Sequence, residues 1–220
     1  MPEIIPPTER TRVVREPHRG SHDRETIYKI LDEGFVCHVG FSVDAQPYVI
    51  PTMFARVGDN IYFHGSAASR MLRNLSAGLA VCVTVTLADG LVLARSVFNH
   101  SMNYRSVMAL GTAVLIDRPE EKLAALRAFT EKILPGRWND ARQPNEKELK
   151  ATSILRLPLT EVSAKIRVGP VEDDAPDYDL PVWAGVIPLR LAPGAPVRDE
   201  RCDPSILVPE YAENYVRTSS

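Results

Sequence analysis

A short turn between a strand-like run and a helix-like run holds the side chains best suited to bind an anion. Residues 61–63 are β-branched or aromatic, which is typical of a strand, and apolar residues recur at helical spacing over residues 67–76. A helix start offers unpaired N–H groups and a partial positive charge, and an arginine there can bind phosphate through charge-assisted bonds. The turn therefore predicts a phosphate site, although a capping serine beside a solvated arginine would give the same pattern. Its polar or small residues are His64, Gly65, Ser66, Ser69 and Arg70.

A second polar segment covers residues 99–106 and reads N-H-S-M-N-Y-R-S. It is dense in hydrogen-bonding groups and directly precedes another strand-like run, residues 107–116. Side chains of this kind at a strand start are candidates to line a pocket. They are Ser101, Asn103, Tyr104 and Arg105.

The elements that must position these two segments are mostly strands. Apolar alternation or continuous apolar runs predict strands over residues 35–41, 48–57, 79–87, 91–98, 107–116 and 153–168, with an edge strand over 182–191. Gly58, Asp59 and Asn60 predict a tight hairpin, and helices are predicted after the cap Asp23, over 67–76 and over 120–134. Such a pattern is typical of an α+β fold, mainly β, in which short helices cover the openings of a small antiparallel barrel.

Composition limits the possible partners. The 220 residues carry a net charge of −2, which gives no basic field for nucleic acid. No apolar run approaches the roughly 20 residues that span a bilayer, and no signal-peptide pattern opens the chain, so we expect a cytoplasmic protein that does not enter a membrane. The three cysteines are widely spaced, which predicts free thiols. His18 and His22 have the spacing of a metal pair on a helix, but Pro17 and Gly20 make that helix unfavourable, and we expect no metal site.

No other catalytic motif competes with the phosphate turn. The chain has no G-x-S-x-G elbow, no G-x-G-x-x-G fingerprint and no G-x-x-x-x-G-K-[ST] loop. Cys82 lies among apolar residues, which disfavours a reactive thiolate. A bound cofactor would then supply the chemistry, and the protein would bind, orient and shield it.

Three motifs together resemble the FMN-binding split-barrel superfamily. They are Y-V-I-P-T (residues 48–52), Y-F-H-G-S-x-x-S-R (62–70) and H-S-M-N-Y-R-S (100–106), and the resemblance covers residues 23–167. The superfamily includes the pyridoxamine 5′-phosphate oxidase-like flavoproteins, and the closer likeness is to its branch related to nitroimidazole-resistance reductases. The resemblance implies a six-stranded antiparallel split β-barrel over residues 24–170, followed by a C-terminal extension over residues 171–220 that packs on the barrel. The composition of residues 1–23, rich in proline, arginine and glutamate, predicts a mobile arm.

The resemblance also implies a role for each motif. The backbone of Ile50, Pro51, Thr52 and Met53 would lie along the flavin ring, and His64 to Arg70 would hold the ribityl phosphate of FMN. Residues 100–106 would line the same pocket, reaching it from the second subunit of a homodimer. His64 would lie beside the flavin and could orient or protonate a substrate, since imidazole titrates near neutral pH. The alternative is a turn histidine that bonds only to backbone.

One departure from the resemblance concerns the substrate. True pyridoxamine phosphate oxidases have a tryptophan followed by an arginine and histidine cluster near the C-terminus. Here Trp183 and Arg190 stand in a different arrangement, and no histidine follows His100. Oxidation of vitamin B6 is therefore not expected, and Trp183 could either cover the pocket or pack as an ordinary core residue.

Three functions are compatible with these residues. The first is an FMN-dependent oxidoreductase that takes electrons from NAD(P)H and reduces a small-molecule substrate such as a nitro compound or a quinone. The second is a non-catalytic module that stores or senses flavin. The third is a haem-binding split barrel in which His64 or His100 is an axial ligand.

Overall fold

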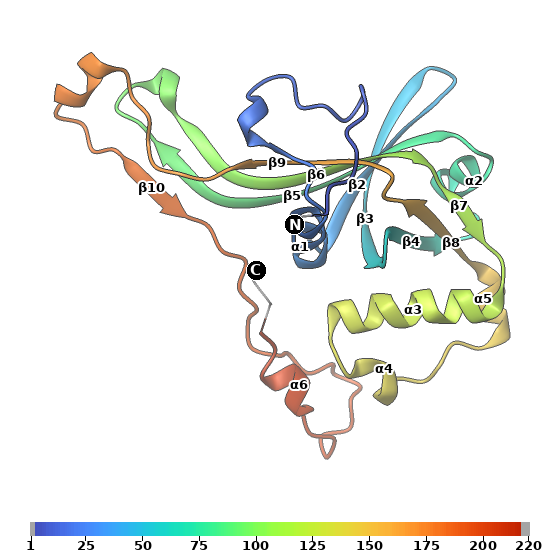
Figure 1. Cartoon of the computed structure of the whole chain (residues 1–220). Coiled ribbons are helices and arrows are strands. Elements are labelled where there is room, and N and C mark those ends of the chain that lie inside the picture. The colour runs from blue at the N-terminus through green and yellow to red at the C-terminus, as the bar shows by residue number, and fades with distance from the viewer. Residues whose placement is uncertain (1–2, 217–220) are drawn as a thin grey trace.

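The computed structural model describes residues 3–216 and shows a strongly curved sheet with short helices around it (Figure 1). Ten strands form this sheet in the order β1-β9-β6-β5-β2-β3-β4-β8-β7, and β10 pairs with β5 beside that path. Every pairing is antiparallel. The predicted α+β class is confirmed. The sheet has more than the six expected strands because short strands extend its edges and two predicted strands, residues 107–116 and 153–168, are each divided in two.

The strands are β1 Gly20–Ser21, β2 Val36–Val43, β3 Gln46–Val57, β4 Asn60–Ser66, β5 Ala80–Leu93, β6 Ser101–Thr112, β7 Val114–Ile116, β8 Thr152–Pro158, β9 Glu161–Arg167 and β10 Gly185–Pro188. The α-helices are α1 Arg24–Glu33, α2 Arg70–Ser76, α3 Pro119–Ile133, α4 Arg137–Asp140, α5 Glu146–Ala151 and α6 Glu210–Glu213. Short 3-10 turns are η1 Pro17–Arg19, η2 Val97–Asn99 and η3 Ala175–Asp179.

Local sequence explains the first helix and the hairpin that follows it. Asp23 caps α1 by accepting a hydrogen bond from the Thr26 N–H at 2.9 Å, as its position predicts. Gly58 has a φ of 55°, the left-handed conformation that a tight turn between β3 and β4 requires. Both predictions are confirmed, and together they fix where β3 and β4 lie relative to α1.

The core lies inside the curved sheet. Phe54, Phe63 and Leu155 are at most 1% exposed, and the predicted inner face of α1 is buried among them. Helix α3 differs from expectation because Phe129 is buried whereas Ile133 is 42% exposed. Near the end of α3 it is Lys132, and not Ile133, that faces the sheet: its Nζ lies 3.7 Å from the centre of the Phe54 ring.

Two strand predictions need correction. The single strand expected over residues 153–168 is β8 and β9, separated by a turn after Pro158, where Leu159 donates its N–H to the Asp59 carbonyl at 2.8 Å. The two runs expected over residues 79–87 and 91–98 belong mainly to one long strand, β5, whose pairing with β6 shifts register between Ala88 and Gly90. A bulge of this kind lets a strand bend and continue.

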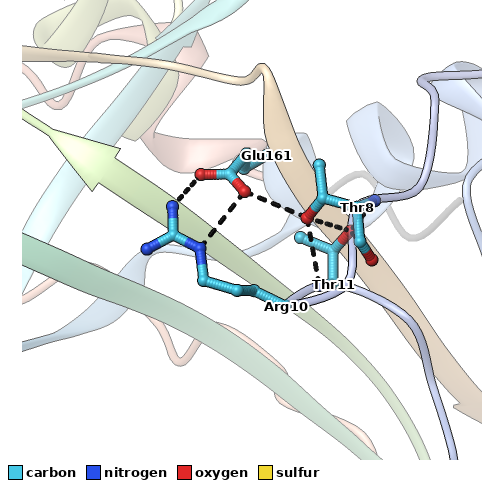
Figure 2. Close-up of polar contacts among 4 residues, drawn as sticks. All are labelled: Thr8, Arg10, Thr11 and Glu161. Atoms are coloured by element: carbon cyan, nitrogen blue, oxygen red, sulfur yellow. Dashed lines mark hydrogen bonds and ion pairs between the residues drawn. The ribbon is translucent and has the colours of Figure 1, made fainter.

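The N-terminal segment, expected to be a mobile arm, packs against β9 in the structure. Ile5 is 4% and Thr11 is 1% exposed, and β1 pairs with β9. Figure 2 shows the polar contact that holds it: Thr8 and Arg10 both donate hydrogen bonds to the Glu161 carboxylate. The prediction of a mobile arm rested on the low apolar content of this segment, but one apolar residue, Ile5, is enough to anchor it in the core. Residues 1–2 of the expected arm and residues 217–220 of the extension lie outside the described residues.

The C-terminal extension runs along the outside of the molecule. β10 pairs with β5, and the chain then passes beside α3 and α4, where α6 lies (Figure 1). Tyr211 of α6 donates a hydrogen bond to Asp140 at the end of α4. None of the helices formed by the described residues is long and apolar enough to cross a membrane.

Candidate functional site

Strands β3 and β4 separate at one end and leave a strand edge open. β4 pairs with β3 only over residues 54–57, whereas β2 pairs with β3 along residues 46–53 on the other side. Among the described residues, the β4-facing edge of residues 48–53 therefore has no strand partner. Pro51 lies on this stretch, and proline is tolerated in a strand where no ladder bond is required of it. An open backbone edge can pair with the polar rim of a flat ligand.

The four residues predicted to lie along a flavin ring are all on this open edge. Ile50 and Thr52 are half-buried, while Pro51 and Met53 are exposed. Across the gap, His64, Gly65 and Ser66 end β4 beyond the last pair of the β3–β4 ladder, Phe54 with Phe63. The structure thus brings two of the three predicted motifs to the same gap.

Arg70 reaches from the start of α2 to β3. Its Nη1 donates a hydrogen bond to the Tyr48 hydroxyl at 3.3 Å, and its guanidinium carbon is 5.5 Å from the centre of the Tyr48 ring. The side chain is otherwise exposed. A cation held over the open edge in this way can bind an anionic group placed in the gap.

The two serines of the turn have different roles. Ser66 accepts a hydrogen bond from the Ala68 N–H at 3.2 Å and so closes the turn. Ser69 is at the N-cap of α2, yet its hydroxyl makes no capping hydrogen bond. That hydroxyl is therefore available to a ligand.

The helix at this turn is shorter than predicted. It begins at Arg70 and not at Ala67, and it ends at Ser76, so it has about two turns. Its dipole is correspondingly small, and its N-terminus alone is a weak anion site. The arginine and the serine hydroxyl would supply most of the attraction.

His64 lies under α3. Its ring packs edge-on against Phe129, with ring centres 4.3 Å apart, and its buried Nδ1 has no hydrogen-bond partner within the protein. Burial lowers the pKa of His64, so the ring is neutral near pH 7. A neutral imidazole can orient a substrate or a ring but is a poor proton donor, which favours the first of the two roles predicted for it.

The third motif lies at the other end of the β5–β6 ladder. Ser101 pairs with Val92, whereas the end of this ladder near α2 is the pair of Thr112 with Ala80. Within one protomer Ser101 to Tyr104 therefore lie away from the gap between β3 and β4, whereas Arg105 lines the same hollow as Val36, the ladder partner of Met53. Ser101 is exposed and Tyr104 is half-buried at that distant end.

Asn103 and Arg105 are already bound within the protomer. Asn103 donates to the Gly169 carbonyl at 3.0 Å. Arg105 donates to the carboxylates of Glu33 and Asp89 at 2.6–2.9 Å, and these hydrogen bonds raise its pKa further above the usual range. Arg105 thus ties β6 to α1 and to the bulge of β5, a structural role that its predicted place in a cofactor site did not include.

Two hollows border these elements. One of about 720 Å³ lies against Tyr48, Val49 and Gly40 and extends to Arg10 and Glu161. The other, of about 790 Å³, lies between Arg105 and the extension at Arg190. The extension therefore closes over the end of the barrel, although Trp183, expected to pack or to cover a pocket, is 67% exposed.

Sequence reasoning missed two residues that shape these regions. Tyr48 was considered only as part of a strand motif, yet it orients Arg70. Asp173 belongs to none of the predicted motifs, yet its side chain is fully buried and anchors residues 95–96. Neither has a local sequence signal, because each contact joins residues distant in the chain.

This fold and this open strand edge define a split-barrel protein with a candidate site for a flat anionic cofactor. The family model described as pyridoxamine 5′-phosphate oxidase matches residues 23–166. The chain belongs to this family, and the predicted membership in the flavin-binding split-barrel superfamily is confirmed. No curated protein matches the chain.

Solved structures give closer relatives. The flavocytochrome Anf3 from Azotobacter vinelandii is 43% identical, with a TM-score of 0.89 and coverage of 94% of this chain and 96% of that one. A FAD- and haem-binding protein from Mycobacterium smegmatis is 35% identical, with a TM-score of 0.85 and coverage of 88% and 95%. A protein described as a 5-nitroimidazole antibiotic resistance protein from Bacteroides thetaiotaomicron is 23% identical, with a TM-score of 0.56 and coverage of 67% and 86%, and shares the fold.

Proposed function

We propose that this protein is a flavin-binding redox protein whose flavin lies between β3 and β4. The observation that carries the proposal is the open edge of residues 48–53 next to the exposed guanidinium of Arg70. The backbone of that edge would orient the ring, and Arg70 with Ser69 would bind the phosphate. The bound flavin would supply the electron-transfer chemistry.

The sequence predicts FMN as the flavin, whereas the name of one relative specifies FAD. Two structures above 30% identity are described as a flavocytochrome and as a FAD- and haem-binding protein. FMN and FAD share the ring, the ribityl chain and the first phosphate, so the same residues serve both. We propose FMN or FAD at this site, and the mass of the cofactor released on denaturation decides between them.

Haem is the second group that we propose for the chain. The same two relatives support it, because they match nearly the whole chain and not only the barrel. Haem binding was one of the predicted alternatives, and its combination with flavin makes this protein a candidate flavocytochrome. Histidine side chains are the usual ligands for such an iron, and five are present in the chain.

The proposed reaction is electron transfer from a donor such as NAD(P)H through the flavin to a small acceptor, of which nitro compounds and quinones are examples. His64, neutral and buried beside the gap, would orient the acceptor or the ring. A cytoplasmic setting is part of this proposal. The other candidate function, a module that only stores or senses flavin, would use the same site without turnover.

The visible spectrum of the purified protein tests the proposal. We expect flavin absorption, a haem Soret band and release of about one flavin per chain on denaturation. Anaerobic addition of NADH or NADPH should bleach the flavin, and slow or absent bleaching by both would favour the storage module. A colourless protein that gains no flavin spectrum when FMN or FAD is added would refute the proposed function.

A further inference from the structure

A third hollow, of about 390 Å³, lies between β3, the end of α3 and the C-terminal extension. Met53, the last residue of the open edge of β3, lines this hollow together with Phe35, the residue just before β2. The other walls are formed by two residues at the end of α3 and four of the extension, namely Ile133, Leu134, Gly194, Pro196, Ala212 and Tyr215. The hollow therefore begins where the proposed flavin site ends.

The extension is fixed on both sides of this hollow. On one side β10 pairs with β5, and the Leu189 N–H donates a hydrogen bond to the Asp89 carbonyl at 3.0 Å. On the other side Tyr211 of α6 donates its hydroxyl to Asp140 of α4 and accepts a hydrogen bond from Arg137 Nη1 at 3.2 Å. Four of the eight lining residues thus belong to an anchored segment beyond residue 166, where the match to the family model ends.

The lining of the hollow favours an uncharged and largely apolar ligand. None of the eight lining residues carries a charge, and among these described residues Tyr215 supplies the one side-chain hydroxyl. Met53 is 38% and Ile133 is 42% exposed, so a flat ligand that covered them would gain the free energy of apolar burial. A charged ligand would lose its hydration here without a counter-ion, which costs several kcal/mol.

The volume of the hollow limits the ligand to a small molecule. Ligand pockets typically measure about 300–1,000 Å³, and 390 Å³ is near the lower end of that range. A two-ring molecule fits such a volume, whereas NAD(P)H is larger and carries phosphates. The hollow therefore suits the electron acceptor of the proposed reaction and not the electron donor.

Met53 brings the hollow next to the proposed flavin. The backbone of residues 50–53 would lie along the flavin ring, and the same Met53 lines the hollow, so a ligand bound there would lie close to the ring. A quinone matches the lining because its ring faces are apolar, it carries no charge, and its carbonyl oxygens accept hydrogen bonds. The Tyr215 hydroxyl is a donor of the required kind.

We propose that this hollow binds the electron acceptor and that the acceptor is a two-ring quinone. The proposal rests on the proposed function, because it needs a flavin beside Met53. Two electrons and one proton come from NAD(P)H and a second proton comes from solvent. Both electrons and both protons reach the quinone by way of the flavin, so the products are NAD(P)⁺ and the hydroquinone. Tyr215 orients the quinone through a hydrogen bond to one carbonyl.

Equilibrium dialysis with menadione, a two-ring quinone, tests binding without turnover. Gly194→Phe should lower the affinity for menadione at least tenfold, because the added ring occupies the hollow. A Cβ at position 194 would meet no atom within 4 Å, and the φ of Gly194 lies outside the left-handed region, so the fold should tolerate this change. Ala195→Phe adds the same ring at an exposed neighbour that does not line the hollow, and it should bind menadione as the wild type does. All three proteins should release the same amount of flavin per chain.

Tyr215→Phe tests the orienting hydrogen bond. Loss of this bond should lower the affinity for menadione about two- to tenfold. The affinity for 2-methylnaphthalene, which lacks the carbonyl groups, should not change. Equal losses for both compounds, or no loss for menadione, would overturn the role of Tyr215.

Reoxidation of the reduced flavin tests whether the hollow serves electron transfer. When photoreduced protein is mixed anaerobically with sub-saturating menadione, Gly194→Phe should be reoxidised at least tenfold more slowly than the wild type. Ferricyanide is a charged acceptor that an apolar hollow does not bind, so it should reoxidise both proteins at the same rate. Equal slowing with both acceptors would overturn the acceptor site.

The outcomes separate this proposal from the proposed function. A wild type whose flavin is bleached by NADH or NADPH but which does not bind menadione would overturn the acceptor site and leave the proposed function intact. Tighter binding of nitrofurazone than of menadione would overturn the quinone class. If saturating menadione converts a dimer to monomers in sedimentation, a second copy and not a quinone occupies the hollow. A protein that binds no flavin would refute the proposed function and the acceptor site with it.

Discussion

At the scale of single residues, the flavin proposal depends on Arg70. We expect Arg70→Ala to weaken flavin binding roughly tenfold to a hundredfold, because a hydrogen-bonded ion pair with phosphate contributes about 1.5–3 kcal/mol. The fold should be unaffected, since the side chain is exposed and contacts only Tyr48 among the described residues. Flavin fluorescence titration measures the affinity, and circular dichroism checks the fold.

Arg73 provides a matched control for this variant. It lies about one turn further along α2 and is exposed, but unlike Arg70 its side chain makes no hydrogen bond to β3 in the part of the chain that the structure describes. Arg73→Ala should bind flavin as the wild type does. Equal losses in the two variants would mean that the general charge of α2, and not a specific contact, attracts the phosphate.

A second residue-scale prediction concerns the pH dependence of stability. Lys132 lies near the end of α3, with its Nζ 3.7 Å from the centre of the Phe54 ring, and burial lowers its pKa to about 8, although Nζ donates to the Leu31 carbonyl at 2.7 Å. Between pH 8 and the ordinary lysine pKa of 10.5, the unfolded chain binds the additional proton, so the free energy of unfolding should rise with pH in this range. Burial raises the pKa of Cys37 to about 12 from 9.0, which makes its contribution fall above pH 9. The net rise should therefore appear between about pH 8 and 9.

Urea unfolding of Lys132→Met measures this contribution. At pH 7 the variant should be more stable than the wild type, by up to about 3 kcal/mol if the lost hydrogen bond is ignored, and the difference should narrow by pH 9. Lys29→Met, at an exposed lysine paired with Glu25, should show no such dependence. A difference that stays constant from pH 7 to 9 would contradict the lowered pKa.

At the scale of elements, Arg105 connects three parts of the fold. It bonds Glu33 at the end of α1 and Asp89 at the bulge of β5, with its side chain 20% exposed. We expect Arg105→Gln to lower the free energy of unfolding by about 1–3 kcal/mol, less than for a fully buried pair because solvent reaches the group. Urea unfolding gives this value, and flavin content gives the second readout. If Arg105→Gln instead loses flavin while its free energy of unfolding is unchanged, Arg105 binds the cofactor directly, as the sequence predicts.

Removal of the Glu161 carboxylate should release the N-terminal segment from β9. Glu161→Ala removes the acceptor shared by Thr8 and Arg10, so trypsin should cleave after residues 10–15 several-fold faster than in the wild type (Figure 2). The melting temperature should change little, because the barrel core does not depend on this contact. Glu9→Ala, at an exposed residue of the same segment, is the control. Unchanged cleavage would mean that Ile5 and Thr11 alone hold the segment.

The sequence predicted correctly those elements that are set by residues close together in the chain. The Asp23 cap, the Gly58 turn and the apolar face of α1 follow from neighbouring residues and were correct. The division between β8 and β9 was missed because the turn at Leu159 carries no glycine or asparagine, and its buried leucine reads as strand. What closes that turn is a hydrogen bond to Asp59, 100 residues earlier, which no local pattern can show.

The candidate site divides in the same way. The open edge of β3 and the turn at Arg70 are close in sequence, and the motifs located both. The contacts that give the remaining polar residues their roles, Arg105 with Glu33 and Asp173 with Ser96, join residues 70–80 positions apart. Only the folded chain shows that the first ties β6 to α1 and that the second anchors residues 95–96.

At the scale of the whole molecule, the proposed homodimer would explain two observations together. Residues 101–104 lie away from the gap between β3 and β4 within one protomer, and the sheet face beside that gap exposes apolar side chains. Val49 is 67%, Val36 is 47% and Met53 is 38% exposed, and Val36 pairs with Met53 across the β2–β3 ladder. A second copy packed on this face would bury these side chains, and its own residues 100–106 could then approach the gap.

Val49→Lys tests the homodimer because it adds a charge to the centre of that face. We expect the wild type to sediment at about twice the chain mass of 24.4 kDa and the variant to sediment as a monomer, since an unpaired charge in an apolar interface costs several kcal/mol. Val197→Lys, at a residue 94% exposed in the extension, should remain dimeric. If the partner completes the flavin site, the monomeric variant should also lose flavin while keeping its far-ultraviolet spectrum. A monomeric variant with full flavin content would instead place the whole site within one protomer, and Ser101 to Arg105 would then have no part in it.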